Sequence, residues 1–225
     1  MTSLTGSGGC AAGKPPRPSG VSGQPAGEVR MYKKQMKCQK AVCLLCMISS
    51  VIVFLYALGI MTDLYDSLYS TMMNPADLTQ TTVPGSIVYY NMQEFNSVFL
   101  KYSIGLILLA CLLYITNTHI RRKYYIGNYV AAALFAIANV NIAVWAHQYI
   151  EIFKAQFLNV DFEALKKHAE LWKTTCTEST FWFDIHAAVF ALSLIASAAL
   201  VGVVLWKVSL MKEEQKLIEA GRKAA

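Results

Sequence analysis

Two histidines and two carboxylates flank the last two long apolar runs of the chain, and these residues have the types best suited to chemistry. His147 and Glu151 are four residues apart, so they share one face of a helix. Asp184 and His186 begin the final apolar run, which we expect to be the antiparallel neighbour at about the same depth. Imidazole combined with carboxylate is a ligand set that zinc accepts.

The spacing nevertheless favours a polar hydrogen-bonded cluster over a metal site. Asp184 and His186 are two residues apart, so they point to different sides of a helix, and the chain has no His-Glu-x-x-His motif. We therefore predict no metal and no cofactor, and keep the four residues only as candidate ligands. The sequence also lacks a P-loop, a GxSxG motif and a nucleophile paired with a base, so we expect no catalytic residues and a non-enzymatic protein.

Three cysteines, Cys38, Cys43 and Cys46, lie at the start of the first apolar run, beside a group of cations. Acyltransferases modify cysteines in this position, so all three are candidate palmitoylation sites. The alternative is that they serve as small apolar residues of the helix. Only Cys176 falls in a predicted outer loop, which excludes an outer disulfide within one chain.

Small and polar residues recur at helical spacing along the third and fourth apolar runs. Small side chains let helix backbones approach closely, and a buried amide gains a partner across such a contact. We predict that this surface packs the two runs together. The alternatives are that it binds another membrane protein, or that Asn139 and Asn141, with Lys101, line a polar path. The stripe comprises Asn128, Ala132, Ala136, Asn139 and Ala143 in the third run, and Ala187, Ala191, Ala198 and Gly202 in the fourth, with Ser193 and Ser197 nearby.

Four charge-poor runs, at about 41–61, 99–116, 126–146 and 185–206, must position these residues. Each is long enough to cross ~30 Å of hydrocarbon as a helix. Of the 225 residues, 55% are hydrophobic and only 15% are charged, whereas soluble domains carry about 25% charged residues. The predicted fold class is an all-α integral membrane protein with four transmembrane helices.

Positive charge distinguishes the two sides of the predicted membrane domain. Fifteen of the twenty Lys and Arg residues fall in segments that alternation places on one side, so we predict that the N and C termini are both cytoplasmic. This placement, facing anionic lipid headgroups, accounts for the net charge of +6 without nucleic acid. The cations next to the membrane are Arg30, Lys33, Lys34, Lys37 and Lys40 before the first run, and Arg121, Arg122 and Lys123 between the second and third.

The segments outside the runs have distinct compositions. Residues 1–29 are rich in Gly, Ser and Pro and are predicted to be a disordered cytoplasmic tail. Residues 30–208 form the predicted four-span domain, and 209–225 a charged helical tail. Short amphipathic helices are expected in the outer loops, most clearly at 161–173, and Val83-Pro84-Gly85 is typical of a turn.

Four spans with both ends inside resemble the broad tetraspan families, but residues 62–98 lack the Trp and Cys of a claudin-like loop, and the chain lacks the Cys-Cys-Gly of a tetraspanin. No specific family is indicated. We expect an accessory or regulatory subunit that binds and modulates a larger membrane protein, such as a channel or transporter, in the plasma membrane or an endomembrane. The alternatives are a homo-oligomeric channel or carrier and, third, an integral-membrane enzyme with a metal site.

Overall fold

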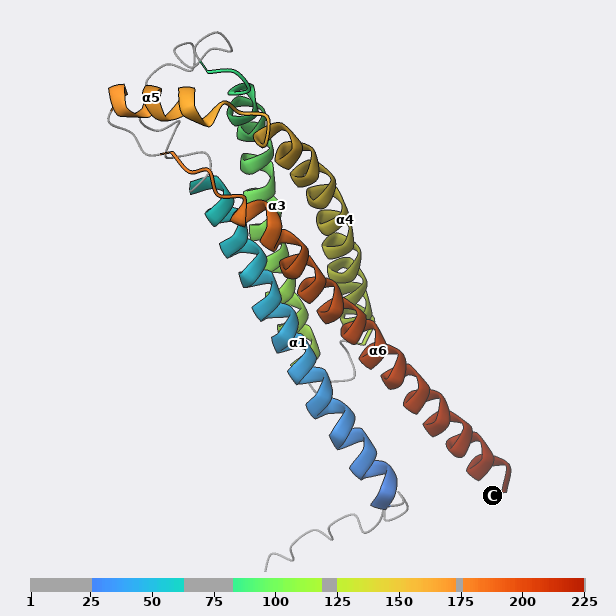
Figure 1. Ribbon diagram of the computed structural model, residues 1–225. Helices are drawn as coiled ribbons and strands as arrows, with labels where there is room; N and C mark the ends of the chain where they lie inside the picture. Colours follow the sequence, from blue (N-terminus) through green and yellow to red (C-terminus); the bar gives the residue numbers. More distant parts are fainter. Residues whose placement is uncertain (1–25, 63–82, 119–124, 173–175, 225) are drawn as a thin grey trace, which may run out of the picture.

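The computed structural model describes residues 26–62, 83–118, 125–172 and 176–224. In these ranges every regular element is helical: α1 (Ala26–Met61), α3 (Ile87–Thr118), α4 (Tyr125–Phe157), α5 (Phe162–Trp172) and α6 (Phe181–Ala224), as Figure 1 shows. The predicted all-α class is confirmed. Four of these helices are long and apolar enough to cross a membrane, over Lys33–Met61, Ile87–Asn117, Ile126–Phe157 and Phe181–Ala220.

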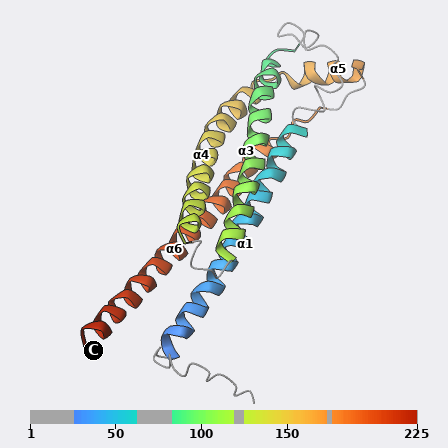
Figure 2. The same cartoon turned by 180° about the vertical axis from the view of Figure 1, so that it is seen from behind.

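The four long helices form an antiparallel bundle in which each runs opposite to the one before it (Figures 1 and 2). Helix α1 packs against α3 and α6, and α4 packs against the same two helices. The first turns of α1 and the last turns of α6 extend from one end of the bundle, whereas α5 lies across the other end (Figure 1). We call these the open end and the capped end.

The helices are longer than the apolar runs that predict them. Helix α1 begins at Ala26, inside the predicted tail, and α6 continues through the charged segment to Ala224. Extending an existing helix adds one hydrogen bond per residue without a new nucleation step, and Ala, Glu, Lys and Gln all favour the helix. Residues 1–25, the first part of the outer loop at 63–82, and Arg121, Arg122 and Lys123 lie outside the described residues.

An aromatic cluster fills the bundle toward its capped end. Phe99 of α3 is fully buried, and its ring centroid lies 6.0 Å from that of Tyr56 in α1, 6.5 Å from that of Trp145 in α4 and 6.2 Å from that of Phe190 in α6. These separations are typical of favourable aromatic contacts. Phe99 therefore joins all four long helices at one point.

The capped end is built around Asp161, the residue immediately before α5. Its side-chain Oδ1 accepts hydrogen bonds from the backbone N–H groups of Glu163 (3.1 Å) and Ala164 (3.0 Å), as an N-cap does. Its own N–H donates to the carbonyl of Pro84 at 3.0 Å. Leu165 is buried on the inner side of α5. An amphipathic helix is therefore present where the sequence predicts one, and it contacts the turn before α3.

On the outer side of α5, Lys166 forms an ion pair with Glu178 in the segment before α6. The hydrogen bond from the Lys166 ammonium to this carboxylate raises the pKa of Lys166 above its ordinary value. Both side chains are exposed to solvent, so the pair contributes little to the stability of the fold.

Gly85 makes the contact between the two loops of the capped end. Its φ of 84° lies in the left-handed region that glycine adopts without strain, as the predicted turn requires. A Cβ at this position would lie 2.7 Å from the carbonyl oxygen of Asn159 and 2.8 Å from the Cα of Val160. Only glycine lets the two backbones approach this closely.

Replacing Gly85 with alanine should therefore lower the thermal unfolding midpoint of the protein in detergent. The strained φ alone costs about 1–3 kcal/mol, and the clash with Asn159 adds to it. Gly127→Ala is the matched control, because a Cβ at Gly127 meets no atom within 4 Å. Equal midpoints for the two variants would contradict the proposed contact between the loops.

Candidate functional site

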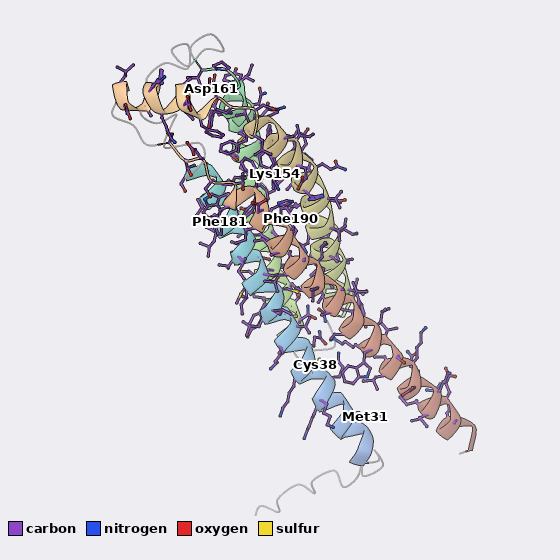
Figure 3. All side chains as sticks on the ribbon, viewed as in Figure 1. Met31, Cys38, Lys154, Asp161, Phe181 and Phe190 are labelled. Atoms are coloured by element: carbon purple, nitrogen blue, oxygen red, sulfur yellow. The ribbon has the colours of Figure 1, made fainter. Side chains whose placement is uncertain are left out.

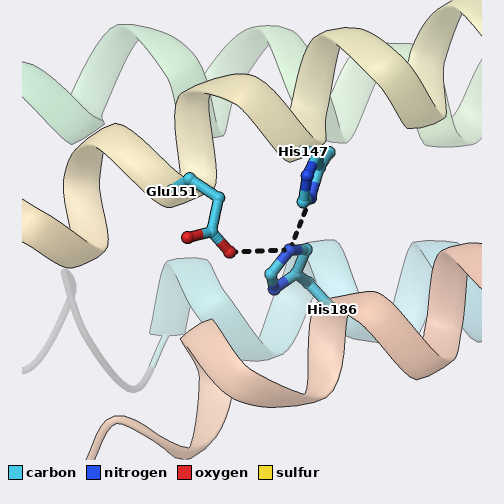
Figure 4. A group of neighbouring side chains, drawn as sticks. All are labelled: His147, Glu151 and His186. Carbon is cyan, nitrogen blue, oxygen red and sulfur yellow. Dashed lines mark hydrogen bonds and ion pairs between the residues drawn. The ribbon is translucent and has the colours of Figure 1, made fainter.

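Three of the predicted chemistry-bearing residues converge near the capped end, between α4 and α6 (Figure 4). His147 and Glu151 come from α4, and His186 comes from α6. The Nε2 atom of His186 lies 2.8 Å from Nδ1 of His147 and 3.4 Å from Oε1 of Glu151. The three ligand atoms all lie within 4.8 Å of one another. We call these residues the His–Glu–His cluster.

His186 has a fixed orientation within this cluster. The residue is 2% exposed, and its Nδ1 contacts the backbone carbonyl of Phe183, one turn earlier in α6. A carbonyl oxygen only accepts, so Nδ1 carries the hydrogen, and in the neutral ring Nε2 presents a lone pair to His147 and Glu151. The other two residues are exposed, so the cluster is open on its outer side.

Asp184, the fourth predicted member, is not part of the cluster. Its carboxylate accepts hydrogen bonds from the ammonium group of Lys154 at 2.6 Å and from the hydroxyl of Thr180 at 2.7 Å. The two-residue offset from His186 turns Asp184 toward a different side of α6, as helical geometry predicts. Including Asp184 among the candidate ligands was therefore wrong.

A second polar contact joins α4 to α6 inside the bundle. The side-chain Nδ2 of Asn139 donates to the carbonyl of Ser193 (2.9 Å) and to the hydroxyl of Ser197 (2.7 Å), and the hydroxyl of Ser193 donates to Oδ1 of Asn139 (2.5 Å). All three residues are buried. Both ends of the amide are satisfied, so this contact fixes how the two helices face each other.

The structure does not bring the residues of the predicted polar path together. Asn139 is buried and hydrogen-bonded, whereas Asn141 and Lys101 are exposed on the outside of the bundle. Within one bundle these three residues do not share a surface; the predicted path belongs to a homo-oligomer and stays a prediction. Because Asn141 and Lys101 are exposed, their side chains are available for contact with lipid or with another chain.

The small-residue stripe lies on two different surfaces. In α4, Asn128, Ala132 and Ala143 are buried and Ala136 is half-buried. In α6, the four small residues all point away from the bundle, so the prediction that they pack against α4 is wrong. Four-residue spacing shows that residues share one face of a helix, but it does not show which way that face points. The face of α6 directed at α4 carries Ser193 and Ser197.

The exposed side of α6 forms a continuous surface of small and branched apolar side chains. At 100° per residue its members fall within about a quarter of the helix circumference. A Cβ added at Gly202 would meet no atom within 4 Å, and Ile195, in the middle of the surface, is 63% exposed. We call this surface the outer face of α6, and its members are Ala187, Ala191, Leu194, Ile195, Ala198 and Gly202.

The three candidate palmitoylation sites have different surroundings. Cys43 and Cys46 are fully buried, and the thiol of Cys46 lies 3.6 Å from the carbonyl of Ala196. Both fit the alternative that cysteine serves as a small apolar residue of the core. Cys38 is exposed near the open end (Figure 3), and it is the one member of the three that an acyltransferase could reach.

A chain of hydrogen-bonded side-chain amides at the open end is not among the residues predicted from the sequence. Gln35 donates to Oε1 of Gln39 at 2.9 Å, Gln39 donates to Oδ1 of Asn117, and Asn117 donates to the carbonyl of Leu113 at 2.8 Å. The three amides are buried and join α1 to α3. The signal was the spacing of two glutamines four residues apart among the cations. The membrane-proximal cations with described side chains, Lys33, Lys34, Lys37 and Lys40, are exposed around them.

Comparison with protein-family models, with curated proteins and with solved structures gives no match. The class of the protein therefore follows from its fold. Four helices long and apolar enough to cross a bilayer suggest a multi-pass membrane protein.

Substituting Asn139 with leucine should destabilise the bundle by roughly 0.6–1.7 kcal/mol, from the average to the largest value measured for hydrogen bonds between membrane helices. The measurement is the free energy of unfolding in mixed detergent micelles. Asn141→Leu is the matched control, because Asn141 lies on the same helix but is exposed. If both variants unfold alike, the contact with Ser193 and Ser197 does not hold α4 to α6.

Proposed function

We propose that the protein is a non-enzymatic accessory or regulatory subunit, which binds and modulates a larger membrane protein such as a channel or transporter. The observation that carries the proposal is the outer face of α6. Within lipid, apolar burial gives little drive for helix association, so close packing of small residues becomes important. The outer face offers such a surface at two points, Ala187 with Ala191 and Ala198 with Gly202.

The composition of this face favours a protein partner over lipid. Helix α6 already uses its other sides to pack against α1 and α4. Alanine and glycine leave the helix backbone open to close approach, and four-residue spacing of small residues is typical of interfaces between membrane helices. The exposed Leu194 and Ile195 between the two pairs would add apolar contacts with a partner helix.

The proposal includes cytoplasmic placement of the open end. Exposed cations gather there on α1, at Lys33, Lys34, Lys37 and Lys40, and on the last turns of α6, at Lys212, Lys216 and Arg222. Cations next to membrane helices favour the cytoplasmic side. With this orientation α5 and the His–Glu–His cluster lie on the opposite side of the membrane.

Thiol labelling tests this orientation. In sealed vesicles whose cytoplasmic face is outward, a membrane-impermeant maleimide should modify a variant with Cys38 as its one cysteine. A variant retaining Cys176 alone should react only after permeabilisation, because Cys176 lies toward the capped end and is partly exposed. The reverse pattern would overturn the orientation.

Filling the outer face of α6 tests the proposed partner contact. The double variant Ala198→Leu/Gly202→Leu should lower recovery of a stoichiometric larger membrane protein in mild detergent by about tenfold or more, which corresponds to ~1.4 kcal/mol. The measurement is quantitative mass spectrometry of the purified complex. The variant should fold normally, because a Cβ at Gly202 has free space.

Gly105→Leu on α3 is the matched control for this experiment, since a Cβ at Gly105 also meets nothing within 4 Å. It should recover the partner as the unmodified protein does. Absence of any larger partner, or equal recovery with the double variant, would contradict the proposal.

A homo-oligomeric channel or carrier is the second candidate, and the exposed Lys101 and Asn141 favour it. Both residues lie within helices apolar enough to span a membrane, where polar groups facing lipid are costly. A second copy of the chain would cover them. Purification of a lone homo-oligomer that passes solute in liposomes would establish this function in place of the first.

A further inference from the structure

We infer that the His–Glu–His cluster is a binding site for a divalent first-row transition metal ion. Zinc is the ion used here as the example. The site would join α4 to α6 near the capped end of the bundle. The inference does not depend on the proposed function, because it concerns a different surface and makes no use of a partner protein.

The separations between the ligand atoms fit a metal ion. Zinc binds histidine nitrogen at about 2.0–2.1 Å and carboxylate oxygen at about 2.0–2.2 Å, so neighbouring ligands of a tetrahedral site lie ~3.3 Å apart. Nε2 of His186 lies 2.8 Å from Nδ1 of His147 and 3.4 Å from Oε1 of Glu151. The third pair of atoms, from His147 and Glu151, lies within 4.8 Å, so rotation of these two exposed side chains would be needed to bring all three atoms to bonding distance.

The hydrogen-bonding pattern calls for a cation at this point. With Nδ1 of His186 engaged by Phe183, Nε2 of the neutral ring is an acceptor, and the carboxylate of Glu151 is also an acceptor. His147 can donate one hydrogen to Nε2, but Glu151 then faces a nitrogen lone pair at 3.4 Å. A metal ion bound by both imidazoles and the carboxylate satisfies all three groups at once.

The surroundings of the cluster resemble those of established metal ligands. A histidine ligand usually donates its other ring N–H to a carbonyl or carboxylate, which fixes the ring and its tautomer, and the Phe183 carbonyl does this for His186. The nearest ammonium group on α4, that of Lys154, is engaged by Asp184 at 2.6 Å. Lys154 acts on Glu151 through its charge and not through a hydrogen bond, so the carboxylate oxygens of Glu151 remain available to the cluster.

The ligand set also limits which ion can bind. Two imidazoles and one carboxylate suit zinc and neighbouring transition metals, whereas calcium and magnesium prefer oxygen ligands. Three protein ligands leave a further coordination position, and the 50% exposure of the Glu151 side chain places it on the outer side. Such an open site has three protein ligands and one position for water or another small ligand, whereas a closed structural zinc site has four protein ligands.

Metal binding by the full-length protein in detergent tests the inference. After chelator treatment, the protein should bind one equivalent of zinc with a rise in thermal unfolding midpoint, and cobalt(II) should give the visible absorption of a tetrahedral nitrogen–oxygen site. His147→Gln and Glu151→Gln should each weaken zinc binding by at least about tenfold. Removing a group that only orients a ligand typically costs about 10–100-fold in metal affinity, and here the ligands themselves are removed. Both residues are exposed, so these variants should fold, whereas His186 is buried.

The controls are His168→Gln and Glu163→Gln on α5, which remove the same residue types outside the cluster and should leave zinc affinity unchanged. Calcium and magnesium should not shift the unfolding midpoint. Zinc binding that is equal in the cluster variants and the controls would overturn the inference. So would a midpoint that depends on pH but not on zinc, because a proton shared by the histidines would then take the place of the metal.

Discussion

The structure depends on one constraint, which is that backbone N–H and C=O groups within hydrocarbon must find their partners inside the same helix. The apolar runs are therefore long, uninterrupted helices, and the bundle must be specified by side chains. A few buried polar contacts carry much of this specification. Asn139 fixes α4 against α6, the Gln39–Asn117 contact fixes α1 against α3, and the Tyr56 hydroxyl donates to the carbonyl of Trp182 at 2.9 Å to join α1 to α6.

The two ends of the bundle are built differently. At the capped end, the turn at Gly85, the cap at Asp161 and the ion pair of Lys154 with Asp184 tie loops and helices together. Figure 3 labels Asp161 and Lys154 there. At the open end, α1 and α6 extend past their neighbours as separate helices (Figure 1). The capped end thus holds side chains in fixed positions, as a ligand site requires, and the open end presents charged helical surface.

The sequence predicts the existence of the elements better than their boundaries or faces. Hydropathy finds the four long helices, and the apolar periodicity around Leu165 finds α5, because burial imposes those patterns directly. The start of α1 at Ala26 lies inside a Gly- and Pro-rich segment, where composition gives no sign of an extended helix. Whether the outer face of α6 points toward the bundle or away from it depends on where the neighbouring helices lie. The residue pattern of α6 alone does not contain that information.

The same limit applies to the candidate ligands. Spacing within α4 correctly places His147 and Glu151 on one face, and spacing within α6 correctly separates Asp184 from His186. The pairing of His147 with His186 depends on the relative height of α4 and α6, which the contact of Asn139 with Ser193 and Ser197 helps to set. Local periodicity therefore identifies the candidates, and packing between helices selects among them.

The packing of the interior bears on where function can lie. Three aromatic rings, one each from α1, α4 and α6, meet the ring of Phe99 in α3, and the Asn139 amide is satisfied by its neighbours in α6. A solute path through the centre of one bundle would have to displace these contacts. Surfaces on the outside of the helices are consequently the better place for recognition, and on α6 that surface is lined by small residues. The filled centre and the outer face of α6 together support the proposal that the protein binds another membrane protein instead of conducting through its own interior.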